Sequence, residues 1–451
     1  MYPSHEKKKK RDLSNRPVKP VLTTGERPQL FYYTILRLLG SLLQLARAFE
    51  GFRLSEGIQF ELQPVMTCFS FLFTRKKNTF SVEHSVEIDE EVSGIQNTKM
   101  FTYKELKTAT GNFHYSNKIG SGGFGVVYKG TLRDGTMVAI KVLSADSKQG
   151  VREFLTEINV VAGIEHENLV ELYGCCVEGK HRILVYSYLE NNSLAQTLLG
   201  GRDSSMQFSW KARRNICIGV AKGLAFLHEE VQPHIVHRDI KASNILLDKN
   251  LNPKISDFGL AKLFPDNMTH ISTRVAGTTG YLAPEYAIRG RLTRKADIYS
   301  FGVLLLEIVS GRCNTNRRLP VSEQFLLERA WNLYGCGQLL ELVDPSLNGE
   351  FDDEEAQKFL KIGLLCTQDL SKLRPSMSQA VKMLMGQEVV NDQNISKPGL
   401  LSDIATLRDQ KDKSGSSSEG TGKGSNSSSS SENITTSHAT MTFNSIFDRS
   451  N

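Results

Sequence analysis

A chain of 451 residues exceeds one ordinary domain, so two or three domains, or one large domain with tails, are expected. Hydrophobic residues make up 39% and charged residues 23%, which indicates that part of the chain stays outside a core. The seven cysteines are scattered without C-x-x-C spacing, which argues against a disulfide framework or a zinc site. The net charge is +6. The basic residues are not interleaved with aromatic residues in a recognisable nucleic-acid-binding module, so a nucleic-acid partner is not expected.

Residues 1–65 are expected to form a disordered extension. Residues 1–28 are polar and rich in proline, and therefore bury too little apolar surface to order themselves. Residues 30–49 are mostly apolar, but Arg37 and Arg47 interrupt them well short of the roughly 20 residues that span a bilayer. An interfacial amphipathic helix remains an alternative there, and no convincing secretion signal is present. Met66 is a candidate for the true start of the protein.

Residues 66–113 are interpreted as a membrane-proximal linker. Cys68 lies among aromatic and aliphatic residues, and the basic residues Arg75, Lys76 and Lys77 follow it. A fatty acyl chain on a cysteine together with a basic cluster forms the pair of signals that stable anchoring needs. The sequence therefore predicts a cytoplasmic protein with peripheral contact to the plasma membrane through Cys68, and the alternative is an unmodified flexible stretch.

A glycine-rich loop opens the central part of the chain. Gly120-Ser-Gly122-Gly-Phe-Gly125 follows a short strand-like segment and runs into the alternating sequence Val-Val-Tyr-Lys, so a strand is expected on each side. Glycines here let backbone N–H groups approach phosphate oxygens. Dinucleotide-binding folds share this spacing, but there the glycines open a helix. Asp134-Gly135 then predicts a hairpin turn into a third strand that ends near Lys141.

Lys141 lies in this apolar strand and needs an anionic partner, because a lone buried lysine is costly. Downstream, the apolar residues from Val151 to Ala162 keep the spacing of an amphipathic helix, and Glu157 lies beside that apolar stripe. Glu157 is the predicted partner of Lys141. The alternative is that Glu157 is an incidental surface charge.

Two polar loops between apolar segments carry the remaining candidate residues. His237-Arg-Asp239-Ile-Lys241-Ala-Ser-Asn244 lies between Ile235-Val236 and Ile245-Leu-Leu247, and Asp257-Phe-Gly259 follows a second short strand-like stretch. Rigid flanks around polar groups are what positional catalysis requires. One such loop could be a simple turn, but two in this order behind a glycine loop and a lysine indicate phosphate chemistry.

Residues 387–451 are expected to form a disordered tail that is rich in serine and open to phosphorylation.

Residues 114–386 resemble the eukaryotic protein kinase family. The resemblance rests on the glycine loop, Val138-Ala-Ile-Lys141, Glu157, His237-Arg-Asp239, Asp257-Phe-Gly259 and Ala283-Pro-Glu285. Phe101-Thr-Tyr-Lys-Glu-Leu106 and the stretch from Gly277 to Tyr286 are similar to those of plant receptor-like cytoplasmic serine/threonine kinases. The implied fold is α+β with two lobes: a small antiparallel β-rich lobe with one main helix at about 114–186, and a larger, mostly helical lobe at about 190–386.

The resemblance implies a serine/threonine kinase that transfers the γ-phosphate of ATP, with Mg²⁺ or alternatively Mn²⁺, to protein substrates and to itself in stimulus signalling. An upstream receptor kinase is the implied activator. Tyr186 is implied to guard the back of the adenine pocket, and Asn244 and Asp257 to bind the metal. The residues implied to contact ATP are Ile119, Gly120, Ser121, Gly122, Gly123, Phe124, Gly125, Val127, Ala139, Lys141, Tyr186, Tyr188, Leu189, Asn244, Leu246 and Asp257.

Five residues are implied to carry the chemistry: Asp239, Lys241, Lys141, Glu157 and Thr278. Asp239 would take the proton of the substrate hydroxyl, and Lys241 would steady the γ-phosphoryl group. Because Arg238 precedes Asp239, activity is predicted to depend on an activation-segment phosphate that neutralises this arginine. Control is expected through Ser272 or Thr273, and the candidates are Thr269, Ser272, Thr273, Thr278 and Thr279.

Two alternatives compete with an active cytoplasmic kinase. A pseudokinase scaffold would be an interaction module, but every expected catalytic position is filled. A transmembrane receptor would need a spanning segment before the kinase, and about 100 residues without such a segment leave little room for a sensor.

Overall fold

The computed structural model describes residues 98–122, 125–144, 148–200 and 206–400. The predictions for residues 1–97, including Cys68 and its basic neighbours, and for residues 401–451 lie outside these ranges. So do those for Gly123 and Phe124.

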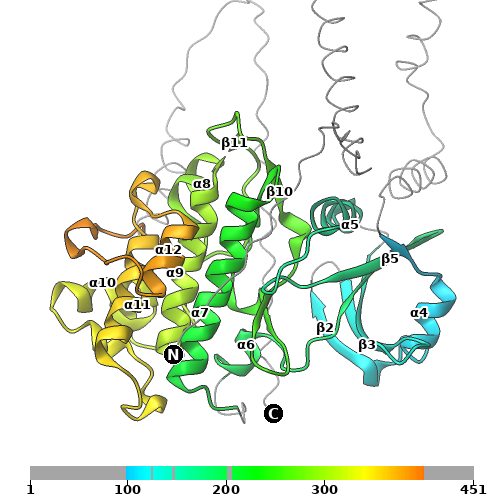
Figure 1. The fold of residues 1–451 in the computed structure, drawn as a ribbon, viewed down its shortest axis with the longest axis horizontal. Coiled ribbons are helices and arrows are strands. Elements are labelled where there is room, and N and C mark those ends of the chain that lie inside the picture. The colour runs from blue at the N-terminus through cyan, green and yellow to red at the C-terminus, as the bar shows by residue number, and fades with distance from the viewer. Residues whose placement is uncertain (1–97, 123–124, 145–147, 201–205, 401–451) are drawn as a thin grey trace, which may run out of the picture. The chain divides into compact units, whose positions relative to one another are not determined.

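The amino-terminal lobe is built on a six-stranded sheet with the order β1-β5-β6-β4-β3-β2 (Figure 1). Its strands are β1 (Lys99–Met100), β2 (Lys118–Gly122), β3 (Gly125–Thr131), β4 (Met137–Leu143), β5 (Leu172–Glu178) and β6 (His181–Ser187). All neighbours pair antiparallel except β1 and β5, which are parallel. β2, β3 and β4 are the three strands predicted around the glycine loop, and the turn before β4 uses Gly135 at a φ of +86°.

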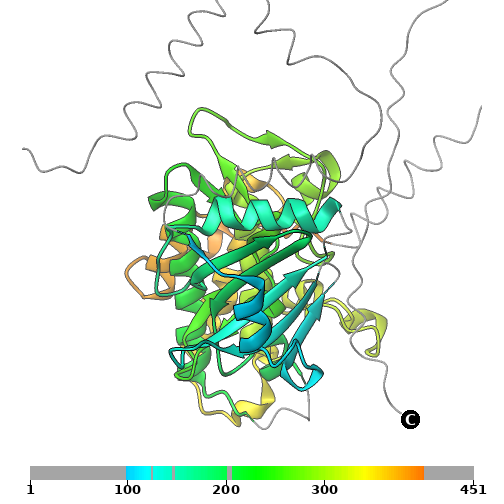
Figure 2. The same ribbon diagram turned by 90° about the vertical axis from the view of Figure 1, so that its right-hand side faces the viewer.

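The main helix of this lobe is α5 (Lys148–Val161), which lies across the sheet in Figure 2. Phe154, Ile158 and Val161 are buried along one face of the helix, as the apolar spacing predicts. α5 also contacts the 3-10 helix Phe258–Leu260, which follows Asp257. The helix that carries Glu157 is therefore packed against the segment that carries Asp257.

Residues 98–113 belong to this lobe, although the sequence analysis placed them in a linker. β1 extends the sheet, and α4 (Tyr103–Ala109) begins with a capping box between Thr102 and Glu105. Phe101 and Leu106 are buried in a small core with residues of β4, β5 and β6. The burial of these apolar side chains explains why the segment folds.

The carboxy-terminal lobe is mostly helical. Its α-helices are α6 (Leu194–Thr197), α7 (Trp210–Ala225), α8 (Pro284–Arg289), α9 (Arg294–Ser310), α10 (Leu326–Gly335), α11 (Asp353–Cys366) and α12 (Met377–Leu384). Helix α9 is the centre of the lobe: residues 296–310 are all buried, and α7, α10 and α11 pack against it. The prediction of a two-lobed α+β fold is confirmed.

Short strands frame the polar loops of this lobe. They are β7 (His234–Val236), β8 (Ile245–Leu247), β9 (Pro253–Ile255), β10 (Lys262–Phe264), β11 (Ile271–Ser272) and β12 (Arg291–Leu292). They form the antiparallel pairs β7-β10, β8-β9 and β11-β12. The lobe also holds a π-helix at Phe226–Glu230 and 3-10 helices at Ala242–Asn244, Phe258–Leu260, Val321–Glu323, Leu339–Leu342, Pro345–Leu347, Ser371–Leu373 and Asp392–Asn394. A further 3-10 helix, Tyr115–Asn117, precedes β2 in the amino-terminal lobe.

Residues 387–400, predicted as the start of the disordered tail, pack against this lobe instead. The Tyr299 hydroxyl donates to the Gly399 carbonyl at 2.5 Å, and both the backbone N–H and the hydroxyl of Ser396 donate to Gln368. Pro398 and Gly399 are buried. The folded region therefore extends to at least Leu400.

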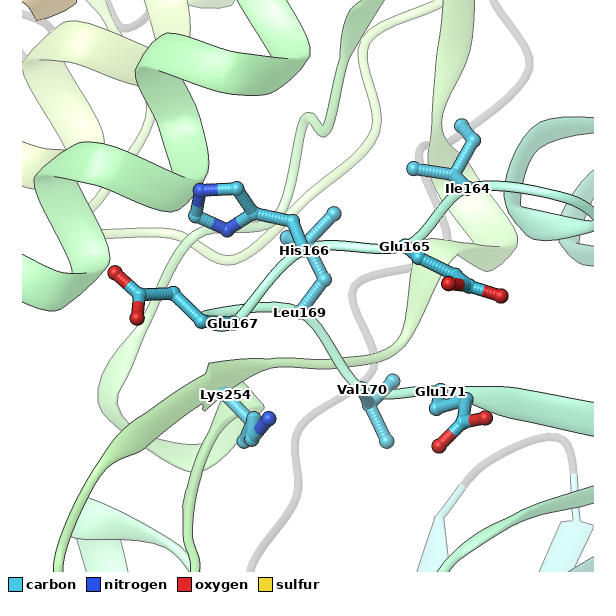
Figure 3. Close-up of a pocket in the computed structure, with 8 residues that line it drawn as sticks. All are labelled: Ile164, Glu165, His166, Glu167, Leu169, Val170, Glu171 and Lys254. Carbon is cyan, nitrogen blue, oxygen red and sulfur yellow. The ribbon is translucent and has the colours of Figure 1, made fainter.

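The connection between α5 and β5 lines a hollow of about 350 Å³, with Lys254 of β9 at its edge (Figure 3). The lining residues are Ile164, Glu165, His166, Glu167, Leu169, Val170, Glu171 and Lys254. None of these residues is among those predicted to contact ATP. Within the described residues, no helix combines the length and apolar character that crossing a membrane requires.

Candidate active site

Lys141 lies between two carboxylates. Its Nζ is 2.5 Å from Glu157 Oε1 on α5 and 2.8 Å from Asp257 Oδ1 after β9. The Glu157 side chain is fully buried, whereas that of Asp257 is 46% exposed. The predicted partner of Lys141 is therefore in contact with it, and the lysine also links the two lobes.

Both members of the Lys141 and Asp257 pair are held in their charged forms. Burial alone would lower the pKa of Lys141, but the carboxylates of Asp257 and Glu157 outweigh burial and raise this pKa. At Asp257, burial would raise the pKa, but the Lys141 ammonium prevails and lowers it. The Lys141 ammonium can therefore bind a phosphate, and the partly exposed Asp257 carboxylate beside it can bind the metal ion that accompanies the phosphate.

Tyr186 of β6 holds Glu157 from the other side. Its hydroxyl donates a hydrogen bond to Glu157 Oε2, and the residue is 9% exposed. The resemblance implied that Tyr186 guards the back of the adenine pocket, and this hydrogen bond was not predicted. No local pattern signals it, since the two residues are 29 positions apart on different elements.

The backbone of the polar loop from His237 to Asn244 is anchored to α9. Asp297 accepts hydrogen bonds from the backbone N–H groups of His237 at 2.6 Å and Arg238 at 2.8 Å. Arg238 has a φ of +73°, which is strained for a residue with a side chain. The buried carboxylate of Asp297 compensates for this strain and fixes the loop just before Asp239.

Asp239 lies at the centre of a compact polar cluster. Thr278 donates to its Oδ1 at 2.7 Å, and Lys241 Nζ lies 2.8 Å from its Oδ2. Lys241 also donates to the Thr278 hydroxyl at 2.8 Å, and Asn244 Nδ2 donates to Asp239 Oδ2 at 3.2 Å. The structure thus brings together four residues that the sequence analysis selected from two distant segments.

Gly277 allows the segment before Thr278 to approach this cluster. Its φ is +122°, and a Cβ there would lie 2.7 Å from the Arg238 carbonyl oxygen. Only glycine fits such a position without a shift of the backbone. Its role was not predicted, because a glycine inside a loop motif does not reveal which backbone passes beside it.

Asn244 and Asp257 are joined through Ser256. The Ser256 N–H and hydroxyl both donate to the Asn244 carbonyl at 2.9 Å, and Asp257 follows in a left-handed conformation at φ +67°. An amide oxygen and a carboxylate are hard ligands, which suits Mg²⁺ bound through one or two side chains plus phosphate oxygens. The residues present therefore fit a divalent metal.

The residues that were predicted to contact ATP, where the structure describes them, lie on or beside neighbouring strands. Val127 pairs with Lys141 and Ala139 pairs with Tyr186, while Leu246 lies on β8. Tyr188 and Leu189 follow β6, and Lys129 Nζ lies 4.6 Å from the Tyr188 ring centroid. Ile119, Gly120, Ser121 and Gly122 belong to β2, and Gly125 to β3.

The glycines of the loop serve different purposes. At Gly125, an added Cβ would lie 2.3 Å from the Val142 carbonyl oxygen, so this glycine is required by sheet packing. At Gly122, an added Cβ would meet nothing within 4 Å. The space over Gly122 is open to a ligand, which suits close approach of phosphate to the backbone.

A bidentate ion pair stabilises the carboxy-terminal lobe below the site. Arg374 is 1% exposed and donates to both carboxylate oxygens of Glu285 at 2.9 Å. The pair joins Glu285 at the start of α8 to Arg374 near the carboxy-terminal end of the folded region. It thereby supports the segment that carries Thr278.

The amino-terminal lobe is built on a β-sheet and carries the Lys141 and Glu157 pair, and the carboxy-terminal lobe is helical. Asp239 and Asp257 belong to the helical lobe, and Asp257 contacts Lys141. This combination defines a protein kinase. The family model described as the protein kinase domain matches residues 113–384, and the chain belongs to this family. It is a serine/threonine protein kinase that uses ATP and a divalent metal and acts on protein substrates.

Curated relatives from Arabidopsis thaliana agree. Cold-responsive protein kinase 1 is 67% identical over 326 residues, which cover 72% of this chain and 84% of that protein. A probable LRR receptor-like serine/threonine-protein kinase is 56% identical over 324 residues. That match covers 72% of this chain but only 31% of the receptor-like relative. The similarity to the receptor-like protein is thus confined to about a third of its length.

Proposed function

We propose that Asp239 is the catalytic base, which orients a serine or threonine hydroxyl and accepts its proton. The observation that carries this assignment is the cluster around its carboxylate. Thr278, Lys241 and Asn244 all contact Asp239, so its position is set from three sides. Such fixed geometry suits phosphoryl transfer, in which positioning and electrostatics supply most of the catalysis.

Lys241 is proposed to steady the γ-phosphoryl group during transfer. The substrate oxygen forms a bond to the γ-phosphorus while the bond from this phosphorus to the leaving oxygen of ADP breaks, and the hydroxyl proton goes to Asp239. Lys241 Nζ lies within 2.8 Å of Asp239, so its positive charge faces the place where negative charge develops on the phosphoryl oxygens.

Lys141 and the glycine loop are proposed to hold the triphosphate. Lys141 is oriented by Glu157, which leaves the ammonium beside Asp257 at the lobe junction. Asp257 and Asn244 would hold Mg²⁺, with Mn²⁺ as a substitute, and the bound metal neutralises phosphate charge. The backbone of β2 and β3 would cover the phosphates, and Ala139, Leu246 and the residues after β6 would flank the adenine.

The site assignment is tested by substitutions at two acids in one segment. Asp257→Ala should abolish transfer of labelled γ-phosphate to a generic basic protein at any Mg²⁺ concentration. The control is Asp266→Ala, because Asp266 is 64% exposed and pairs with His234 outside the site. Transfer by Asp257→Ala at the rate of the control would disprove the metal assignment, whereas a wild type without transfer would support the scaffold alternative.

We also propose peripheral membrane contact through Cys68 and the basic residues Arg75 to Lys77, with an upstream receptor kinase as activator and autophosphorylation in stimulus signalling. The support is the pairing of a cysteine with a basic cluster and the similarity to kinases named as receptor-like. Hydroxylamine cleaves thioesters, so it should release the wild-type protein from membranes. A Cys68→Ser variant that fractionates like the wild type would contradict acylation at this cysteine.

A further inference from the structure

Thr278 begins a tight turn beside the proposed base. Its hydroxyl donates to Asp239 at 2.7 Å, and its carbonyl accepts the N–H of Tyr281 at 3.1 Å. Gly280, within the turn, is buried and has a φ of +103°. Because the hydroxyl that contacts Asp239 belongs to this turn, the position of residues 278–281 sets the position of that contact.

A protein substrate has to pass close to the same turn. Its serine or threonine hydroxyl must reach the Asp239 carboxylate, and Thr278 already contacts that carboxylate. Residues that hold the 278–281 turn in place therefore act on phosphoryl transfer without touching the substrate or the nucleotide.

Helix α9 holds the end of the turn. The Tyr281 hydroxyl donates to both carboxylate oxygens of Glu307, at 2.8 and 2.7 Å, and the Ser300 hydroxyl donates to the Tyr281 carbonyl at 2.7 Å. Glu307 and Ser300 are both buried. Burial and the Glu307 carboxylate raise the pKa of Tyr281, so its hydroxyl keeps the proton that it donates. The side chain and the carbonyl of Tyr281 are thus both fixed to α9.

Asn314 holds the middle of the turn from outside α9. It lies in the connection between α9 and α10 and is 4% exposed. Its Nδ2 donates to the Gly280 carbonyl at 2.8 Å, and its backbone N–H donates to Glu307 Oε1 at 2.7 Å. Its own carbonyl accepts the N–H of Leu326, the first residue of α10, at 2.8 Å. Asn314 therefore joins the turn, the carboxylate that binds Tyr281, and α10.

The amide of Asn314 is packed closely over Gly280. A Cβ added to Gly280 would lie 3.1 Å from Asn314 Nδ2. Without the amide, the buried Gly280 carbonyl would lose this donor, and a buried carbonyl without a partner is costly. The backbone would then shift toward another donor, and Thr278, two residues earlier, would shift with it.

We infer that Asn314 is a positioning residue for phosphoryl transfer: its amide fixes the Gly280 carbonyl and, through the turn, the Thr278 hydroxyl on Asp239. The inference rests on the proposed roles of Asp239 and Thr278. The sequence does not reveal it, because Asn314 lies in a polar connection 34 positions after Gly280.

Two substitutions at Asn314 test this role. Asn314→Ala removes the amide, and Asn314→Asp keeps the shape of the side chain but replaces the donor with an acceptor. Both should lower kcat for a serine peptide roughly 5- to 20-fold, because one buried hydrogen bond is lost. The KM for ATP should stay within about twofold, because Lys141 and Glu157 are untouched. The rates are measured below the thermal unfolding midpoint of each variant, and one folded variant is sufficient for the test.

Asn316→Ala is the matched control. Asn316 lies two positions later in the same connection, and its Oδ1 accepts the N–H of Arg318 at 3.1 Å. Its own N–H donates to the Gln324 carbonyl, so these bonds stay within the connection. Asn316→Ala should therefore keep kcat within about twofold. A general disturbance of the connection would slow both alanine variants alike.

A second comparison separates positioning from a loss of stability. In a Thr278→Ala background the hydroxyl contact with Asp239 is already absent, so adding Asn314→Ala should lower kcat further by less than about twofold. Two independent effects would instead multiply. A merely structural role for Asn314 would therefore leave its effect on kcat unchanged by the Thr278 substitution.

Three results would overturn the inference. They are wild-type kcat in a folded Asn314→Ala or Asn314→Asp variant, equal losses of kcat in Asn314→Ala and Asn316→Ala, and effects of Asn314→Ala and Thr278→Ala that multiply. In each case the wild-type enzyme still transfers phosphate and the proposed function stands. A wild type without transfer would overturn both.

Discussion

Replacing Thr278 with alanine is expected to slow phosphoryl transfer while leaving nucleotide binding intact. The hydroxyl donates to Asp239 at 2.7 Å and accepts from Lys241 at 2.8 Å. Each bond to a charged group contributes about 1.5–3 kcal/mol. Because Lys241 and Asp239 keep their direct contact at 2.8 Å, the net loss should be close to that of one bond. About 2 kcal/mol of lost positioning corresponds to roughly a 30-fold lower kcat.

The assay is steady-state transfer to a serine peptide, with kcat and the KM for ATP measured separately and thermal unfolding measured in parallel. Thr278→Ser keeps the hydroxyl and should stay within a few fold of the wild type. Thr279→Ala, at the exposed neighbouring position, should leave kcat unchanged. A Thr278→Ala variant within twofold of the wild type, or a Thr278→Ser variant as slow as Thr278→Ala, would refute the reasoning.

Three further changes probe stability. Burial raises the pKa of Glu307 to about 7, so the folded state binds a proton that the unfolded state has lost above its ordinary pKa near 4.5. Relative to Glu307→Gln, the wild-type free energy of unfolding should therefore fall by on the order of 3 kcal/mol between pH 4.5 and 7.5; parallel curves would contradict this. Arg374→Ala leaves Glu285 without its partner and should cost about 3–5 kcal/mol in chemical denaturation, and an unchanged midpoint would show the pair to be dispensable. Leu106→Ala should cost about 2–5 kcal/mol, because Leu106 is fully buried; a negligible cost would return residues 98–113 to a linker.

The parts of the fold that were predictable are those with short-range patterns. The three strands around the glycine loop follow from alternation and a turn signal, and α5 follows from apolar spacing. The contact between Lys141 and Glu157 was predictable because a buried lysine demands an anion. Such inferences need only a few neighbouring residues and the rule that a buried charge requires a partner of opposite charge.

The contacts that sequence reasoning missed join distant positions. Tyr299 reaches Gly399 across 100 residues, and Arg238 reaches Tyr286 across 48. A tyrosine hydroxyl can both donate and accept, so composition does not show which partner each will find. The family model spans residues 113–384, close to the predicted 114–386. That residues 98–113 and 387–400 also fold was missed for a related reason: their apolar side chains pack against elements far away in the chain.

The central claim is that Asp239 is the base and that the nucleotide is held by other residues. The direct measurement is transfer of labelled γ-phosphate by Asp239→Asn, with nucleotide affinity measured on the same preparation and Lys141→Met as the comparison. We predict that Asp239→Asn binds nucleotide like the wild type but transfers phosphate at least 100-fold more slowly, whereas Lys141→Met loses both. Transfer by Asp239→Asn at near the wild-type rate would contradict the account.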